Sequence, residues 1–313
     1  MAGAGYGTGW ARAALLAWLL AGCAGVPPAA PERPVTPSPA PGPAVSAESA
    51  ALASYYGQVQ AELLSQGLLR TDMGGADTPF TDRMLAENFL AIAFYEEYDR
   101  ALGGIVRREA PIPLTRWARP VRVQLNFGAS VPINLRTTDT LRVDSYLSRL
   151  SRLTGLRIGL ADSATDFAIF IADVDERRAL GPTLQALLPE LSPAQINSMT
   201  EMDRNTYCQV VTQSDPATST YTGAVAVIPA EHPDLLLMSC IHEEIAQALG
   251  LPNDSGLARP SIFNDDQEFA LLTRQDELML KILYSPELRP GMTEIQARPV
   301  VEMLARRLMG GEG

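Results

Sequence analysis

The chain has 313 residues, of which 46% are hydrophobic and 19% are charged, values typical of a folded globular protein. Its formal net charge of -11 argues against nucleic acid as a partner, because phosphate binding requires clustered cationic side chains. The length suits one large domain, or one domain with a helical extension.

The N-terminus predicts a secretory leader over residues 1–22. Arg12 precedes a short apolar run, Ala13 to Leu20, and small residues follow it. A basic residue, an apolar stretch and a small-residue cleavage site together make a signal peptide. The alternative is a transmembrane anchor, which is disfavoured because the run is shorter than the roughly 20 residues that a spanning helix needs.

The sequence Leu-Ala-Gly-Cys at residues 20–23 resembles the lipobox of bacterial lipoproteins. The resemblance implies cleavage before Cys23 and attachment of a diacylglycerol to its thiol, so that the membrane becomes a partner through a lipid anchor. Ala24 follows the cysteine where an aspartate would suggest retention at the inner membrane. By analogy with enteric bacteria, we expect a periplasm-facing protein of the cell envelope, at the outer membrane more than at the inner one.

Residues 23–47 predict a tether. Eight prolines stand from Pro27 to Pro43, with alanine and serine among the residues between them. Such a segment cannot build a core and favours the extended polyproline II conformation. We expect it to act as a spacer, with recognition by a proline-binding domain as the alternative. The globular domain is then expected to span residues 48–313.

The first part of this domain predicts two helices, at residues 48–69 and 81–102, because apolar residues recur there at spacings of three and four. The end of the second helix carries Glu96 and Arg100. Their i,i+4 spacing predicts an ion pair on a solvated helical face.

A mixed sheet is predicted next. Residues 121–125 alternate with period two, and residues 167–172 form the continuous apolar run of a buried strand. Further strands are predicted at 157–160, 207–212 and 222–228, and helices at 140–153, 175–188, 192–198, 275–284 and 299–309. The fold class is therefore α+β, with N-terminal helices and a mixed sheet.

One long helix is predicted to begin at His232-Pro233-Asp234, directly after the strand at 222–228. We expect that strand to form the sheet edge above a cleft. Cys208 and Cys240 remain as an even pair once Cys23 is lipidated, and in the oxidising periplasm they predict a disulfide that clamps the long helix to the sheet. Two buried free thiols are the alternative.

The most informative stretch is residues 240–254, Cys-Ile-His-Glu-Glu-Ile-Ala-Gln-Ala-Leu-Gly-Leu-Pro-Asn-Asp. It resembles the zinc helix of metzincins, H-E-x-x-H-x-x-G-x-x-H, but reads E-E-x-x-Q-x-x-G-x-x-N. Glu243, Gln247 and Asn253 fall at the positions of the three histidines, and Glu244 falls at that of the general base. The resemblance implies a zincin-like architecture in which this helix carries the active site.

The spacing of these residues suits a three-ligand site. Glu243 and Gln247 are one helical turn apart, and a turn at Gly250 would bring Asn253 or Asp254 back toward them. Oxygen donors favour calcium, magnesium or manganese, whereas zinc prefers histidine and cysteine.

Three interpretations of this group stay open. It is a catalytic zinc site, a divalent-cation or polar ligand pocket, or a structural network that pins the helix end to Asn264 or Asp265. His242 lies about 100° around the helix from Glu243 and therefore out of phase with the candidate ligands. We expect a structural or surface role for it.

Two segments extend the resemblance. Residues 272–286 are similar to the closing segment of matrixin-like metzincins, where a Leu-(Ser/Thr)-x-x-Asp helix ends in Leu-Tyr-Gly. The block from Cys240 to Met292 also resembles the proteobacterial lipoprotein family catalogued as domain of unknown function 2927. Its signature stands here as Glu-Glu-x-x-Gln, Gly-Leu-x-Asn-Asp and Ser-Ile-Phe-Asn-Asp. The family would cover residues 80–300, and it names no reaction.

Two functions fit these observations. The missing histidines favour a non-catalytic envelope protein that binds a peptide or another envelope protein by adding a strand at the sheet edge. The alternative is a metal-dependent hydrolase, most simply a peptidase. In it Glu244 would deprotonate a metal-bound water, and the metal would be held by Glu243, Gln247 and either Asn253 or Asp254.

Overall fold

The computed structural model describes residues 45–98, 107–163, 165–264 and 266–310. The predicted signal peptide, Cys23, most of the tether, Arg100 and Asp265 lie outside these residues. All described residues belong to one compact unit, Pro41–Gly313. In this part of the chain, no helix combines the length and the apolar composition that crossing a membrane requires.

The predicted mixed sheet is confirmed. It has five strands in the order β4-β3-β5-β7-β6, of which β6 alone runs antiparallel to its neighbour. In chain order the strands are β3 (Val121–Phe127), β4 (Ile158–Leu160), β5 (Phe167–Ala172), β6 (Gln209–Asp215) and β7 (Thr220–Pro229).

The expectation that the strand before the long helix forms the sheet edge is wrong. That strand is β7, which pairs with β5 on one side and with β6 on the other. The physical reason lies in composition: β7 is almost wholly buried and apolar, which suits an interior strand, whereas β6 carries Thr212, Gln213 and Ser214 and is partly exposed throughout. The edges of the described sheet are therefore β6 and the short β4.

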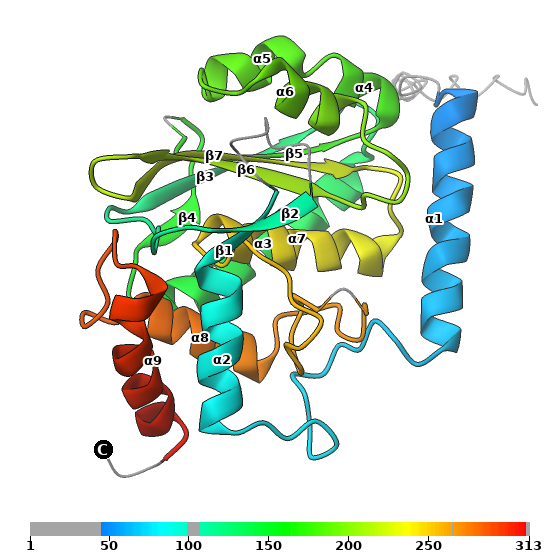
Figure 1. Cartoon of the computed structure of the whole chain (residues 1–313). Helices are drawn as coiled ribbons and strands as arrows, with labels where there is room; N and C mark the ends of the chain where they lie inside the picture. Colours follow the sequence, from blue (N-terminus) through cyan, green and yellow to red (C-terminus); the bar gives the residue numbers. More distant parts are fainter. Residues whose placement is uncertain (1–44, 99–106, 164, 265, 311–313) are drawn as a thin grey trace, which may run out of the picture. The chain divides into compact units, whose positions relative to one another are not determined.

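Helices cover both faces of the sheet (Figure 1). One face carries three short helices, α4 (Val174–Arg178), α5 (Gly181–Leu187) and α6 (Pro193–Thr200). A single helix at 175–188 was predicted in place of the first two. The other face carries α3 (Ile133–Thr154) and α7 (Asp234–Ala248), and the larger apolar core lies between them and the sheet.

Four further helices complete the described fold. They are α1 (Ala47–Ser65), α2 (Asp82–Ala93), α8 (Arg274–Leu283) and α9 (Glu294–Leu308). Two predicted starts were late, because α3 begins at Ile133 and α9 at Glu294. The capping box between Thr293 and Gln296 begins α9 before Pro299, so this proline lies inside the helix.

The second predicted helix is shorter than expected. It ends at Ala93, and Tyr95–Tyr98 forms strand β1, which pairs antiparallel with β2 (Arg107–Pro111). The predicted helical face at Glu96 is therefore wrong. Pairing with a distant segment overrides the local helical pattern here, and this hairpin was missed because β2 has no clear alternation of its own.

The predicted disulfide between Cys208 and Cys240 is confirmed, with a sequence separation of 32 residues. It joins α7 to the segment just before β6. Closing a loop of this length contributes roughly 3–4 kcal/mol to folding in the loop-entropy model.

The C-terminal end of α7 is buried and its last carbonyl groups are bonded by side chains. Trp117 donates its indole N–H to the Ala248 carbonyl at 2.8 Å, and the Tyr284 hydroxyl donates to the Leu249 carbonyl at 2.8 Å. Gly250 then takes φ of 122°, and a Cβ at this position would lie 2.5 Å from the Thr115 carbonyl oxygen. Only glycine fits this turn.

Candidate functional site at the end of helix α7

The candidate site residues on helix α7 differ in exposure. Glu244 is 4% exposed, whereas Glu243 and Gln247 are partly exposed on a shared face. The Gln247 side-chain amide donates to Asp254 Oδ1 at 3.4 Å. The turn at Gly250 therefore brings Asp254 back to the helix face, as the sequence predicts.

Asn253 is used differently. Its side-chain amide donates to the Ala91 carbonyl at 3.0 Å, and its backbone N–H donates to the Ile92 carbonyl at 3.3 Å. These bonds tie the turn after α7 to the end of α2. The Asn253 Oδ1 atom is buried and has no hydrogen-bond partner among the described residues. Asn253 thus holds two helices together.

The residues present do not fit a catalytic zinc centre. Within the described ranges, no three His, Cys, Asp or Glu side chains are arranged to hold a metal ion. Two of the four candidate ligands, Gln247 and Asn253, have amide side chains, which zinc seldom uses. Glu244 is buried, whereas a general base must reach the water that it deprotonates.

His242 anchors three parts of the fold, which agrees with the structural role expected for it. Its ring stacks on Tyr146 of α3, with 3.9 Å between ring centroids and 6° between planes. Its Nδ1 accepts the Leu272 backbone N–H at 3.1 Å, so the neutral ring carries its proton on Nε2. Burial, reinforced by the charge of Arg149, lowers the pKa of His242 to about 3.

The Ser-Ile-Phe and Leu-Thr-x-x-Asp motifs meet at one buried carboxylate. Asp276 of α8 is fully buried and accepts the Ser261 hydroxyl at 2.5 Å and the backbone N–H groups of Ile262 and Thr273 at 3.1 and 2.8 Å. Burial raises the pKa of Asp276, against the effect of these donors. The motifs therefore form a structural clamp that holds the segment after α7 on α8.

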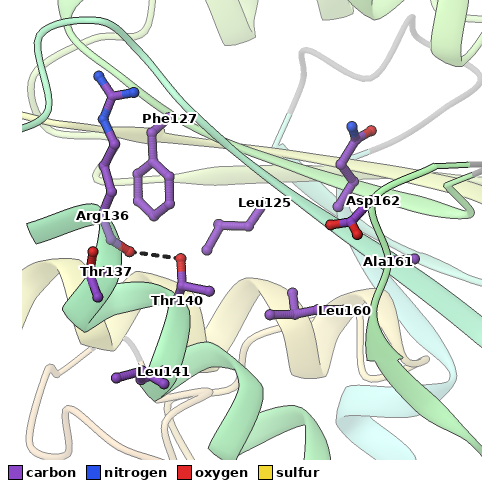
Figure 2. Close-up of a pocket in the computed structure, with 10 residues that line it drawn as sticks. Leu125, Phe127, Arg136, Thr137, Thr140, Leu141, Leu160, Ala161 and Asp162 are labelled. Atoms are coloured by element: carbon purple, nitrogen blue, oxygen red, sulfur yellow. Dashed lines mark hydrogen bonds between the residues drawn. The ribbon is translucent and has the colours of Figure 1, made fainter. Parts of the chain in front are cut away.

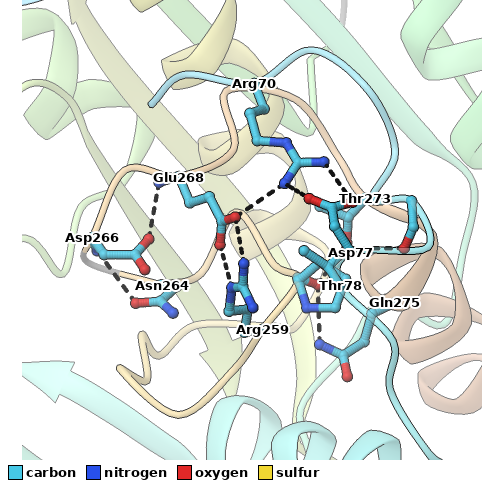
Figure 3. Close-up of polar contacts among 12 residues, drawn as sticks. Arg70, Asp77, Thr78, Arg259, Asn264, Asp266, Glu268, Thr273 and Gln275 are labelled. Atoms are coloured by element: carbon cyan, nitrogen blue, oxygen red, sulfur yellow. Dashed lines mark hydrogen bonds and ion pairs between the residues drawn. The ribbon is translucent and has the colours of Figure 1, made fainter. Parts of the chain in front are cut away.

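Asn264 does not bond to the end of α7 through any described contact. Its Oδ1 accepts the Asp266 backbone N–H at 3.2 Å, within the loop before α8. An ion network borders this loop (Figure 3): Glu268 accepts from Arg70 at 3.1 Å and from Arg259 at 2.5 Å. The network closes the loop after α1 on the loop before α8, and no sequence pattern marks it because its members are far apart in the chain.

A second polar cluster lies beneath α1. Glu231 accepts the Ser49 hydroxyl at 2.9 Å and the Val174 backbone N–H at 2.7 Å, and the His232 ring packs on Tyr56 with 4.3 Å between centroids. Burial raises the pKa of Glu231. Burial and the charge of Arg177 lower the pKa of His232 to about 3. No local sequence pattern predicts this cluster, since α1, α4 and the turn before α7 each supply part of it.

A pocket of about 520 Å³ lies between β3 and α3 (Figure 2). The strand β3 lines it with Gln124, Leu125 and Phe127, α3 with four side chains, and the segment after β4 completes it. The α3 side chains are Arg136, Thr137, Thr140 and Leu141. This pocket was not predicted from the sequence either, although the apolar-polar alternation at 121–125 continues to Phe127.

Comparison with known proteins supports one assignment. The family model described as a protein of unknown function, DUF2927, matches residues 82–303, and the chain belongs to this family. The match runs from α2 into α9 and confirms the predicted family region, while α1 precedes it. No curated protein and no solved structure matches the chain.

The Asp276 clamp predicts a large effect on stability. Asp276→Ala leaves three buried donors without an acceptor, so we expect the free energy of unfolding to fall by about 3–5 kcal/mol. Urea unfolding followed by circular dichroism measures this change. Asp144→Ala on the exposed face of α3 is the matched control, with a change below about 0.5 kcal/mol. Equal effects of the two substitutions would remove Asp276 from its structural role.

The two buried histidines predict acid sensitivity. Their folded pKa values are about 3. Below about pH 6.5 the unfolded chain therefore binds protons that the folded chain does not. The stabilisation is complete above pH 6.5 and is lost as the pH falls toward 3, by roughly 1.4 kcal/mol per pH unit for each ring.

We expect His242→Gln to reduce this dependence by one ring's share. Urea unfolding at several pH values between about 6 and 4.5 gives the slope of the unfolding free energy for each protein. Identical slopes in the variant and the unsubstituted chain would show that His242 does not stay neutral in the fold.

Proposed function

We propose that this member of the DUF2927 family is a lipid-anchored protein of the bacterial cell envelope that binds a peptide or another envelope protein without catalysing a reaction. The lipobox-like residues 20–23 and the proline-rich tether support an anchor at Cys23 and a domain that faces the periplasm. The disulfide Cys208–Cys240 supports an oxidising compartment.

The burial of α7 carries the non-catalytic part of the proposal. Ten of its fifteen residues are buried, and they lie on all sides of the helix. A catalytic helix must turn its general base to a cleft that admits substrate, whereas the Glu244 side chain of α7 is buried with the core residues. The metzincin-like pattern supports a zincin-like architecture for the hairpin β6–β7 and the helix that follows it.

The residues at the former ligand positions support the same conclusion. Asn253 holds α2, and Gln247 contacts Asp254. Each of these bonds is useful to a packed helix end, and amides in these roles do not activate water as a zinc-bound site would. The divergent hydrolase with Glu244 as general base is therefore the weaker proposal, and metal content separates the two.

The anchor is tested by Cys23→Ala. We expect the unsubstituted chain, expressed in a bacterium, to incorporate radiolabelled palmitate and to sediment with the membranes, because its cysteine carries the acyl chains. The variant should lose the label and stay out of the lipid-modified fraction. Label that persists in Cys23→Ala would show that Cys23 does not carry the lipid.

The non-catalytic reading is tested on the full chain, purified in detergent without chelator or histidine tag. We expect metal content by plasma mass spectrometry to be far below one ion per chain and unchanged in Glu243→Ala. Hydrolysis of fluorescein-labelled casein should stay at background in both the unsubstituted chain and Glu244→Gln. A stoichiometric metal that Glu243→Ala removes, together with hydrolysis that Glu244→Gln abolishes, would establish the hydrolase instead.

A further inference from the structure

Within the described residues, no strand pairs with the edge of β3 beyond the end of β4. The Val121 N–H donates to the Arg157 carbonyl, and the Ala161 N–H donates to the Val123 carbonyl, both at 2.9 Å. In a parallel strand, the N–H and C=O of one residue both face the same neighbouring strand, and those of the next residue face the strand on the other side. Leu125 and Phe127 therefore turn theirs to this same edge, where β4 has already ended.

The pocket lies against this open edge (Figure 2). Leu125, Phe127 and Leu160 line it with partly buried apolar side chains. On α3, Leu141 is 67% exposed and Ile133 is 76% exposed, and the pocket residue Thr137 stands between them at i,i+4 spacing. Backbone hydrogen-bonding groups and an apolar groove are thus side by side, which is the arrangement that takes an extended peptide.

The charge at the rim selects among peptides. The Arg136 guanidinium donates to the carbonyls of Val131, Gly128 and Ala129 at 2.7, 2.8 and 3.1 Å. These hydrogen bonds hold Arg136 on the loop after β3. Asp162 is exposed on the opposite rim. A chain with net charge -11 and a carboxylate at this rim favours a peptide with a basic residue there.

The loop that ends the groove is held in place before any partner arrives. Glu176 of α4 accepts the Ser130 backbone N–H at 2.8 Å and its hydroxyl at 2.6 Å. Gly128 lies so close that a Cβ there would be 1.8 Å from Glu176 Oε2. A fixed groove loses little conformational entropy on binding, which favours affinity for a short segment.

We propose that the β3 groove binds a short extended segment of a partner protein, which adds a strand beside Leu125 and Phe127, places an apolar side chain in the pocket and sets a basic residue near Asp162. This proposal rests on the binding function proposed above and names its site and its ligand class. The chain's own tether is a poor occupant, because its eight prolines between Pro27 and Pro43 lack the N–H groups that a ladder needs.

Phage-displayed random octapeptides, selected on the full chain in detergent micelles, provide the probe. The best peptide is synthesised, and its affinity is measured by fluorescence polarisation for the chain and for Leu141→Arg. We expect Leu141→Arg to weaken binding about tenfold or more, because it puts a cation into the groove. Leu135→Arg, on the same helix but outside the pocket lining, is the matched control and should leave the affinity unchanged.

Two readouts locate the bound peptide. Hydrogen exchange followed by mass spectrometry should show slower exchange over residues 124–128 when the peptide is present. N-methylation of the peptide at alternate residues should weaken binding about tenfold, because it removes ladder hydrogen bonds. Circular dichroism confirms that both arginine variants fold.

Several outcomes would overturn the groove as the site. Selection that yields no binding peptide, protection over β6 in place of 124–128, or affinity that survives Leu141→Arg would each do so. None of these outcomes decides whether the protein is an enzyme, which the metal and casein measurements determine separately.

Discussion

Because the C-terminal end of α7 is buried, the last backbone carbonyl groups of this helix need hydrogen-bond partners inside the protein. This requirement organises the surrounding structure. Trp117 and Tyr284 donate hydrogen bonds from other segments to the last carbonyl groups of α7. Asn253 donates to the Ala91 carbonyl and so ties the turn after α7 to α2. The disulfide at Cys240 fixes the middle of the same helix. The sheet, α2 and α8 are thus positioned around one helix.

The family motifs take a different meaning in this setting. Residues of the pattern that resembles a catalytic signature help to close the fold around α7. The carboxylate of Asp276 gathers donors from the Ser-Ile-Phe segment, and Gly250 passes within contact of the backbone at Thr115. Such positions tolerate little change. Few residues can replace a buried hydrogen-bond acceptor, and only glycine fits a turn that has no room for a side chain.

Local patterns predicted much of the fold and less of the site. The apolar run of β5, the proline that begins α6 and the spacing within α7 are each readable within one segment, and the structure agrees with them. The hairpin β1–β2 and the interior place of β7 depend on pairing between distant segments, which no short pattern encodes.

The same reason explains the site. The Gln247–Asp254 contact was predictable because the two residues are only seven positions apart, on either side of the turn at Gly250. The polar cluster at Glu231 and the groove at Leu125 each draw on three separate segments. The hydrogen bond from Asn253 to Ala91 could not be predicted from a local pattern, because Ala91 lies on a helix far away in the chain. Residue type alone does not show which neighbour a polar side chain will meet.

Helix α1 gives the family boundary an unexpected meaning. The family region begins at residue 82, yet Ser49 completes the hydrogen bonding of Glu231 and Tyr56 covers the ring of His232. A protein trimmed to the family region would uncover a buried carboxylate and a buried imidazole at once. The folded unit therefore extends beyond the family region, and any partner that dislodged α1 would act on the turn that begins α7.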